Sequence, residues 1–255
     1  MKKCYLLFFI LMFGFALAAC DNHANDEPET IAPNATEETD VETEPEGNIA
    51  AVEEVDEPEV VEDSARLNLE ITQFGYSISD DQEFLHYGIE IHNPNLNYDI
   101  DFPVISITLF DEDGLIISHD EQTLFTIAAN DTVAWGDFVG TNGTYPAHVE
   151  VELVALEGDF STATATPTSE LFTISNTSES SNDFGNTYTG TIENLSDEEF
   201  TSVAVTILLF QDNEIIYGHT GFVNQVTPGG TSHFDINILT NIADHDRYEI
   251  SAQPW

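Results

Sequence analysis

The chain has 255 residues and carries 48 aspartates and glutamates against 4 lysines and arginines, a formal net charge of −44 at pH 7. A surface this acidic repels nucleic-acid phosphates, whose binding requires lysine and arginine, so the composition excludes nucleic-acid recognition. It also repels anionic lipid headgroups. The interpretation we favour is an exported protein kept soluble in a saline or alkaline medium by its charge.

The first nineteen residues have the layout of an export signal. Two lysines precede an uncharged apolar run over residues 5–19, which is the order found in signal peptides. The run is shorter than the about 20 apolar residues that a membrane-spanning helix needs. It ends in Leu17-Ala18-Ala19-Cys20, which resembles the lipobox of bacterial lipoproteins. A plain secretory signal with a chance cysteine is the alternative.

The lipobox resemblance implies a lipid anchor on Cys20. In that family the signal, here residues 1–19, is removed and the cysteine thiol receives a diacylglyceryl group. Two acyl chains hold a protein stably on a bilayer, so we expect a location on the extracytoplasmic face of the cell membrane. The only other cysteine, Cys4, leaves with the signal, and the processed chain therefore has no disulfide, cysteine zinc site or cysteine nucleophile.

Residues 20–64 are predicted to form a disordered acidic tether. The stretch 21–63 contains 17 acidic residues, no lysine, no arginine and no aromatic residue. Such a segment cannot bury enough apolar surface to offset the entropy cost of ordering. A flexible coil of this length spans roughly 35 Å, which would hold the folded part away from the membrane.

Two related segments follow the tether. "YGIEIHNPNLNYDIDFPVISITLFDEDGLIISH" (87–119) matches "YTGTIENLSDEEFTSVAVTILLFQDNEIIYGH" (188–219) with a single-residue gap. The match continues into residues 125–138 and 224–237, and aligns Trp135 with Phe234. A repeat of about 100 residues is too long for a solenoid unit and indicates tandem domains. We predict one domain over 65–158, a connector over 159–170 and a second domain over 171–255.

Both copies have the pattern of β-strands. In "VISITLF" (104–110), Ile105, Ile107 and Leu109 alternate with more polar positions, which predicts a strand with one buried face. Gly114 and, in the second copy, Asn213 suit hairpin turns that need a left-handed backbone. We therefore expect an all-β protein of two tandem immunoglobulin-like β-sandwiches, with Trp135 and Phe234 in their cores.

The strand motifs also resemble FxLYD domains, small β-sandwich modules found on bacterial lipoproteins and other extracytoplasmic proteins. The resemblance rests on "VISITLFDEDGLII" with "ANDTVAWGDF", and on "VAVTILLFQDNEII" with "TPGGTSHFDI". It covers about residues 85–153 and 187–251. It departs from the family's naming motif at five positions: Ile107, Ile207, Phe110, Phe210 and Gln211. It implies a binding or structural module without catalytic residues.

The histidines are the first candidates for metal or acid–base sites. His86 and His92 share one strand face but stand about 20 Å apart along an extended strand, too far for one ion. His119 and His219 occupy equivalent repeat positions, and we expect them in exposed loops. "ADHDRY" (243–248) is interpreted as a solvated turn with a surface ion pair. "DEDG" (111–114) lacks the remaining ligand positions of a calcium loop.

The sequence thus predicts a protein without catalytic, cofactor-binding or metal-binding residues, and no enzyme motif is present. The leading hypothesis is a lipid-anchored surface protein whose two sandwiches bind or space an extracellular protein or cell-wall partner. The first alternative is a polyanionic, cation-binding wall or coat protein. The second is a solute-binding lipoprotein of a transporter, although the known bilobal receptors alternate strands with helices and this chain does not.

Overall fold

The computed structural model describes residues 65–182, 185–238 and 244–255. The predicted signal peptide, Cys20 and the acidic tether lie outside the described residues. The described part is almost entirely β-structure, with one 3₁₀ turn, η1 (Glu157–Asp159), and one helical turn, α1 (Thr168–Leu171). Among these residues no helix has the length and apolar character needed to cross a bilayer.

The first sandwich has two three-stranded antiparallel sheets. Sheet 1a consists of β1 (Glu70–Ile78), β2 (Phe84–His92) and β6 (Thr132–Gly140), in that order. Sheet 1b consists of β5 (Ile116–Thr123), β4 (Val104–Phe110) and β7 (His148–Val154). A short pair, β3 (Tyr98–Ile100) with β8 (Phe160–Thr162), closes one end.

The second sandwich repeats this plan. Sheet 2a consists of β13 (Thr231–Ile238), β10 (Gly185–Asn194) and β9 (Phe172–Asn182), and sheet 2b of β12 (Glu214–Val226), β11 (Phe200–Gln211) and β14 (Arg247–Pro254). In both copies the strands divide between the sheets as strands A, B, E and C, F do in immunoglobulin-like domains. The expected all-β fold with immunoglobulin-like sandwiches is confirmed.

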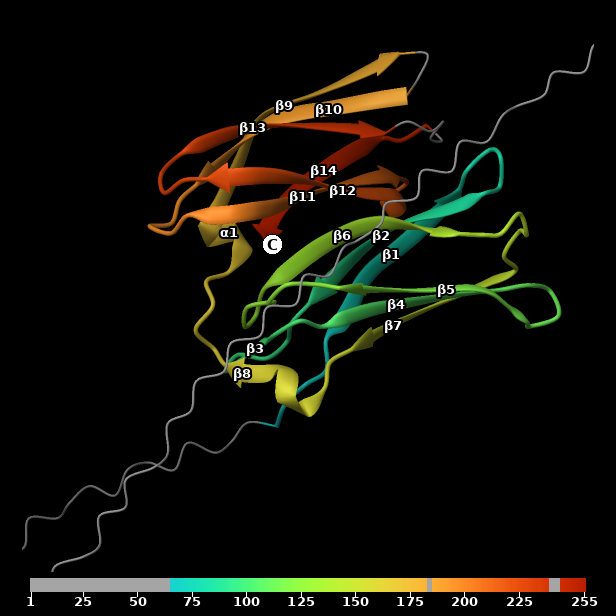
Figure 1. The fold of residues 1–255 in the computed structure, drawn as a ribbon, viewed down its shortest axis with the longest axis horizontal. Coiled ribbons are helices and arrows are strands. Elements are labelled where there is room, and N and C mark those ends of the chain that lie inside the picture. The colour runs from blue at the N-terminus through green and yellow to red at the C-terminus, as the bar shows by residue number, and fades with distance from the viewer. Residues whose placement is uncertain (1–64, 183–184, 239–243) are drawn as a thin grey trace, which may run out of the picture. The chain divides into compact units, whose positions relative to one another are not determined.

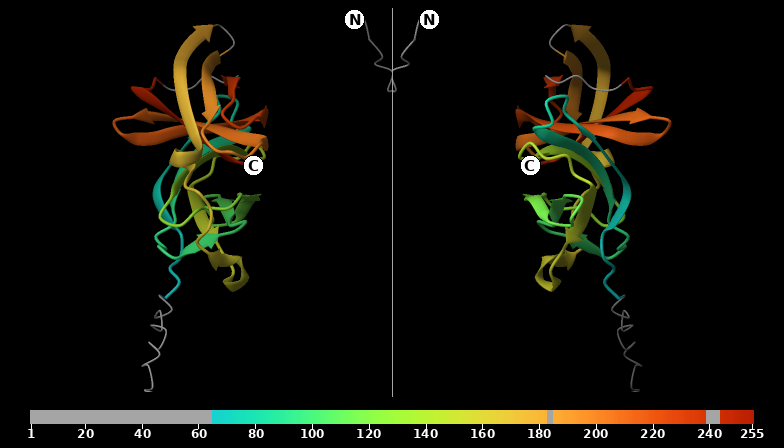
Figure 2. Two further views of the ribbon diagram at one scale, coloured as in Figure 1. Left: turned by 90° about the vertical axis from the view of Figure 1, so that its left-hand side faces the viewer. Right: turned by 90° about the vertical axis from the view of Figure 1, so that its right-hand side faces the viewer.

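The four sheets lie one above another in the order 1b, 1a, 2b, 2a (Figure 1). Sheet 1a faces sheet 2b: β1, β2 and β6 all contact β12, and β6 also contacts β11. Two side views show the same succession of layers (Figure 2). The contact between sheets 1a and 2b, which we call the seam, therefore joins the two sandwiches face to face.

Each sandwich encloses the core that the strand alternation predicts. Ile105, Ile107 and Leu109 are buried between sheets 1a and 1b, and Trp135 joins the same cluster. Phe234 is buried in the second core. The two turns also form as predicted, with φ of 76° at Gly114 and 67° at Asn213. Both core and turns are thus local consequences of the sequence pattern.

A buried asparagine braces the same loop in both sandwiches. The Asn93 side chain is fully buried and donates hydrogen bonds to the carbonyls of Tyr98, Ile127 and Ala128. Its repeat partner Asn194 is equally buried and bonds carbonyl groups of its own loop. The carbonyls of Ile127 and Ala128 also accept backbone hydrogen bonds, from Ile100 and Asp131, so the repeated asparagine adds a side-chain donor that links these loop segments.

Residues 159–170, predicted as a connector, contain β8 and most of α1. The strand β8 pairs with β3 of the first sandwich. At α1 the chain is held by Asp131, whose carboxylate accepts hydrogen bonds from the backbone N–H and the hydroxyl of Thr168. The passage between the sandwiches is therefore attached to the first one at both ends.

Candidate functional site: the seam between the sandwiches

A row of glycines forms the centre of the seam. Gly75, Gly88 and Gly136 stand side by side on β1, β2 and β6, because Gly75 pairs with Gly88 and Gly88 pairs with Gly136. All three lie on the outer face of sheet 1a. Gly218 of β12 lies against the row from the other side. The two sheets therefore meet through bare backbone at this point.

The approach is too close for any side chain. A Cβ atom on Gly75 would lie 1.6 Å from the carbonyl oxygen of Ile215, and one on Gly136 would lie 2.2 Å from the amide nitrogen of His219. Both obstacles are backbone atoms, which cannot move aside as a flexible side chain can. Glycine in a strand marks such a close approach of another backbone. The row thus requires glycine for the sandwiches to dock.

Apolar and polar contacts complete the seam around the glycines. Ala134, Leu208, Phe210 and Ile215 form a buried cluster with members from both sandwiches. Ala204 of β11 packs into the core cluster of the first sandwich. The Gly136 N–H donates a 3.1 Å hydrogen bond to the Thr220 hydroxyl, and Gln73 donates one to the Asn213 carbonyl. The contact is therefore packed and hydrogen-bonded like a domain interior.

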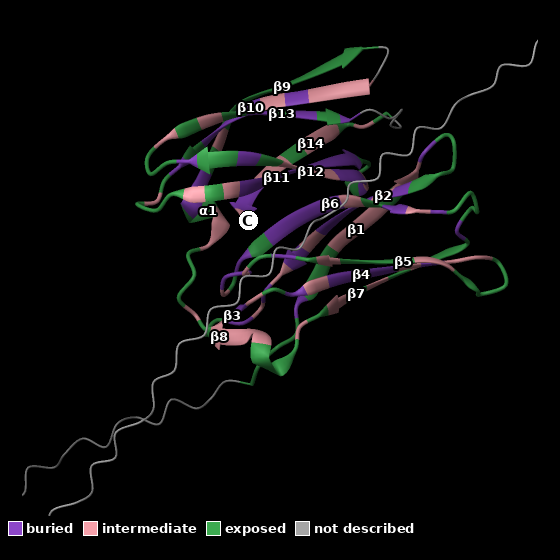
Figure 3. Cartoon of the chain, viewed as in Figure 1, coloured by how far each residue is buried: buried purple, intermediate pink, exposed green. Residues whose placement is uncertain are grey.

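The burial pattern of β11 reflects contacts on both of its faces. Residues 203–210 are buried without interruption (Figure 3), whereas the equivalent β4 is only half-buried at Val104, Thr108 and Phe110. The reason is that β11 has a core on one face and the seam on the other. A continuous apolar run is the pattern of strands that are covered on both faces.

An acidic crevice opens at one end of the seam. It has a volume of about 590 Å³, within the usual size range of ligand sites. Four segments build it: residues 125–131 of the first sandwich, 164–171 between the sandwiches, and 196–202 and 254–255 of the second sandwich. Its aromatic and acidic lining residues are Phe125, Phe200, Trp255, Asp131, Asp197, Glu198 and Glu199.

The crevice is lined by aromatic and other apolar side chains together with carboxylate and hydroxyl groups. Trp255 stacks on Trp135 of the first sandwich, with ring centroids 4.8 Å apart. Asp131 is committed to the backbone of Thr168, whereas Glu198 and Glu199 are exposed. No lysine, arginine or histidine is among the described lining residues. The crevice therefore offers ring surfaces and hydrogen-bond acceptors contributed by both sandwiches.

A second, smaller cleft of about 360 Å³ contains two histidines. His86 of β2 stacks on Tyr217 of β12, with ring centroids 5.0 Å apart and an angle of 28° between the rings. His219 lines the same cleft, together with Phe84 and Phe138. Burial, followed by repulsion from His219, lowers the pKa of His86 to about 4. Burial also lowers the pKa of His219 below its ordinary value.

The position of His219 corrects a prediction. It does not lie in an exposed loop but in β12, in a half-buried position at the seam. Its repeat partner His119 lies in β5, exposed and paired with Thr108. The first hairpin is one residue longer: Phe110 pairs with Ile116, whereas its equivalent Phe210 pairs with Ile215. Because a shift of one residue turns a side chain to the opposite face of a strand, His219 pairs with Ile207 and shares the core face of sheet 2b, whereas His119 pairs with Thr108 on the outer face of sheet 1b.

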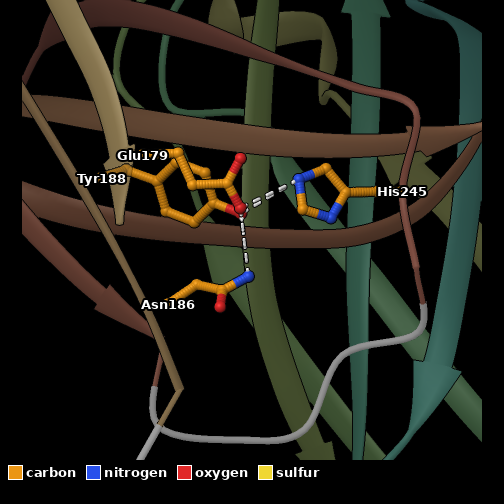
Figure 4. Close-up of polar contacts among 4 residues, drawn as sticks. All are labelled: Glu179, Asn186, Tyr188 and His245. Atoms are coloured by element: carbon orange, nitrogen blue, oxygen red, sulfur yellow. Dashed lines mark hydrogen bonds and ion pairs between the residues drawn. The ribbon is translucent and has the colours of Figure 1, made fainter. Parts of the chain in front are cut away.

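The segment 243–248, described from residue 244, differs in part from the solvated turn that we predicted. His245 is mostly buried, and its Nε2 lies 3.2 Å from Oε1 of Glu179. The same oxygen accepts hydrogen bonds from Asn186 and from the Tyr188 hydroxyl (Figure 4). Burial raises the pKa of Tyr188, so its phenol stays protonated. This cluster ties β9 and β10 to the segment before β14.

The segment contributes a surface ion pair, although the acidic partner lies outside residues 243–248. Arg247 pairs with Glu249 two residues along β14. Its guanidinium also lies over the ring of Phe210, 3.6 Å from the centroid. Such stacking adds a cation–π attraction to the ion pair. Arg247 therefore covers one end of the apolar seam cluster to which Phe210 belongs.

The other residues considered as metal ligands have ordinary local partners. His86 and His92 share the outer face of β2 but do not meet, since the His92 ring contacts Thr132. The Asp111 carboxylate accepts hydrogen bonds from the backbone of Asp113 and Leu115, as in an ordinary turn. Within residues 65–182, 185–238 and 244–255, no group of three histidine or acidic side chains is placed to hold a metal ion.

Sequence reasoning missed the seam, although signals for it were present. Comparing the two copies shows Gly88 and Gly136 where the second copy has Thr189 and Asp235. The same comparison shows Leu208 where the first copy has Thr108. Each exchange turns a polar outward position into glycine or leucine. Such a difference between repeats marks the faces that one copy covers on the other.

The comparisons with known proteins do not identify a family. No family model matches the chain, and no curated protein matches it. Among solved structures, red sea bream transglutaminase is similar over 74% of this chain and 31% of its own length, at 11% identity and a TM-score of 0.26. The chain thus spans less than a third of that protein. A likeness at this level says nothing about the activity of this chain.

Proposed function

We propose that this is a lipid-anchored extracytoplasmic protein that presents its two β-sandwiches as one rigid, non-catalytic binding unit. The observation that carries the proposal is the seam. Because glycine backbones pack against each other across it, the sandwiches form one rigid body rather than two independently moving domains. A rigid body can display a composite surface, and the acidic crevice is the part of that surface to which both sandwiches contribute.

The anchor in this proposal is Cys20, and the tether is residues 20–64. Both are expectations from the sequence and lie outside the described residues. They fit the described part in one respect: the folded body begins immediately after the acidic stretch, with β1 starting at Glu70. The resemblance to FxLYD modules of bacterial lipoproteins supports the same location. The proposed partner is an extracellular protein or a cell-wall component.

The crevice is the proposed place of contact with that partner. Its aromatic walls supply the anchoring surface that is typical of the centre of protein interfaces. Its carboxylates favour a partner that brings a positive charge or hydroxyl groups. The binding energy would then come from both sandwiches at once, so the geometry of the seam would determine the affinity.

The first test concerns the anchor. Cells producing the full-length protein or the Cys20→Ser variant are separated into membrane, soluble and medium fractions. We expect the unchanged protein in the membrane fraction, and the variant either released or retained in an unprocessed form that still carries the signal. Processed Cys20→Ser protein that stays with the membrane would rule out the lipid anchor.

The second test concerns the crevice. The full-length protein is captured from its native membrane after mild cross-linking, in parallel with Glu199→Lys and with Glu152→Lys as a matched control. Glu199 is in the crevice, whereas Glu152 is equally exposed on the outer face of sheet 1b. A partner that is lost with Glu199→Lys and kept with Glu152→Lys supports the proposal. A partner set that is identical for all three proteins would overturn it.

A further inference from the structure

Two histidines of different sandwiches line one cleft beside the seam, together with Ser79, Asp81 and Asn237. His86 projects from the outer face of sheet 1a, stacked on Tyr217 of sheet 2b. His219 lines the same cleft from β12, one residue beyond Gly218. The glycine row brings these strands to backbone contact. Docking of the two sheets thus places both imidazoles on one cleft.

We propose that the seam is an acid-sensitive joint, in which protonation of His86 and His219 separates sheet 1a from sheet 2b while each sandwich stays folded. The proposal goes beyond the proposed function and does not depend on it. Two positive charges placed in one small, partly buried cleft repel each other, and each loses hydration there. Separation of the sheets relieves both costs.

The charged and titratable groups around the pair come from three strands and a turn. Asp81, in the turn between β1 and β2, attracts a proton to His86. Asp137 of β6 does the same for His219. Tyr217 of β12 contributes a neutral ring, because burial raises the pKa of its phenol. Asp120 of β5 acts on Asp137 rather than on the histidines.

These carboxylates do not outweigh burial. For His86 the largest cause is desolvation, which lowers the pKa to about 4 although Asp81 opposes the shift. For His219 desolvation again exceeds the attraction of Asp137. Ser79 donates a hydrogen bond to the Asp81 carboxylate, so this group is already partly engaged. The closed seam therefore prefers both imidazoles neutral.

The direction of the pH effect follows from this preference. In the open state the histidines titrate near their ordinary pKa of about 6.5. The open state thus binds more protons than the closed state between about pH 6.5 and the lowered value. Acidification in that window favours opening, by at most about tenfold per pH unit for each histidine. Allowing for solvent screening, we expect the closed-to-open ratio to fall about 10- to 100-fold from about pH 7 to about pH 5.

Two carboxyl groups act in the opposite direction. Burial raises the pKa of Asp137 and of Glu90, the latter on the seam face of β2. A carboxyl group that is more easily protonated in the closed state stabilises that state as the pH falls. The ordinary pKa values of aspartate and glutamate, about 3.9 and about 4.3, lie about two units below that of histidine. The histidine effect is therefore expected to dominate at the less acidic end of the window.

The chain carries its own reporter of the seam. It has only two tryptophans, and Trp135 of the first sandwich stacks on Trp255 of the second. Opening the seam separates the rings and exposes them to water. The crevice at that end is walled by both sandwiches, so opening would also dismantle it. This last consequence alone rests on the proposed function.

The test follows tryptophan emission of the purified full-length chain from pH 7.5 to pH 4.5, with far-ultraviolet circular dichroism and the radius of gyration at each pH. We expect a red shift of the emission and a larger radius between about pH 6.5 and about pH 5, with unchanged strand content. The double variant His86→Gln/His219→Gln should lack this transition. His119→Gln, at the position equivalent to His219 but exposed on β5, should keep it.

The proposal fails if the unchanged protein shows no transition, or if the double variant shows the same one. Should the double variant not fold, proton NMR of the unchanged protein decides instead. Two of its eight histidines should titrate well below the others, at the pH where the tryptophan signal changes. Eight histidines that all titrate near the ordinary value would overturn the proposal.

Discussion

The two sandwiches have similar cores, but the outer faces of their equivalent sheets carry side chains of different character. Both bury an aromatic residue at the same place, Trp135 or Phe234, and both use one buried asparagine to brace a loop. Their outer faces differ. Across sheet 1a runs the row Gly75, Gly88 and Gly136, and across sheet 2a the row at the same register is Ser178, Thr189 and Asp235.

The difference shows that the core and the outer face of a repeat are under separate requirements. The core positions must match in volume, because interiors are close-packed. The outer positions depend only on what covers them. Sheet 1a is covered by another backbone and needs glycine, whereas sheet 2a faces water and carries hydroxyl and carboxylate groups. The same sheet of the repeated fold is therefore a covered layer in the first sandwich and a solvent-facing layer in the second.

The largest expected effect comes from Gly136→Ala. The new Cβ would meet the backbone of His219, so the seam cannot close without a shift of the sheets. We expect a loss of about 3 kcal/mol, at the upper end of overpacking effects, with a larger radius of gyration. Gly140→Ala in the same strand is the control, since its Cβ meets nothing within 4 Å. Equal effects of the two changes, measured by urea unfolding, would contradict the interlocking row.

A somewhat smaller effect is expected from Leu208→Thr, which gives β11 the residue that β4 has at this position. It removes buried apolar surface from the seam cluster and introduces a hydroxyl group there. The expected loss is about 2 to 3 kcal/mol. The reverse exchange, Thr108→Leu on the open face of sheet 1b, should change the free energy of unfolding by less than about 0.5 kcal/mol.

The shared asparagines test the similarity of the two interiors. Asn93→Ala removes the side-chain donor from the carbonyls of Tyr98, Ile127 and Ala128, and Asn194→Ala removes the equivalent donor in the second sandwich. We expect each to cost about 2 kcal/mol in urea unfolding. Costs that differ by more than about 1 kcal/mol would show that the two loops do not use the asparagine equally.

The smallest effect is expected from Thr189→Gly, which places a glycine of the row on the open sheet 2a. Without a covering sheet, glycine brings only its greater loss of backbone entropy and the loss of the Ser178 hydrogen bond. The expected cost is about 1 kcal/mol. A stabilisation, or a change of oligomeric state in analytical ultracentrifugation, would mean that sheet 2a is covered in solution.

The sequence predicted the sandwiches better than their docking, for a physical reason. Alternation at Ile105, Ile107 and Leu109 and the turn residues Gly114 and Asn213 act on their own neighbours, so their pattern is visible along the chain. The glycine row is assembled from three strands, and β6 is separated from β1 and β2 along the chain by β3, β4 and β5. A single glycine in a strand forms no recognisable sequence pattern. Only the pairing of β1, β2 and β6 places the three glycines side by side.

The positions of the histidines show the same limit of sequence-based prediction for single residues. His119 and His219 are equivalent in an alignment, yet the shorter second hairpin pairs His219 with Ile207, on the core face of sheet 2b, whereas His119 pairs with Thr108 on the open face of sheet 1b. Register decides the face of a strand, and it depends on how each turn closes. The seam histidines were therefore visible as residues, but their meeting was not.

The docking of sheet 1a on sheet 2b joins two different faces, and a head-to-tail contact of this kind does not close on itself. If sheet 2a had retained the glycine row and sheet 1b the apolar face of sheet 2b, every molecule could dock onto the next, and the chains would grow into open-ended fibres. The hydroxyl and carboxylate side chains on the two outermost sheets remove both partners of that contact. The polar row of Ser178, Thr189 and Asp235 thus leaves sheet 2a without the bare backbone that such a contact needs.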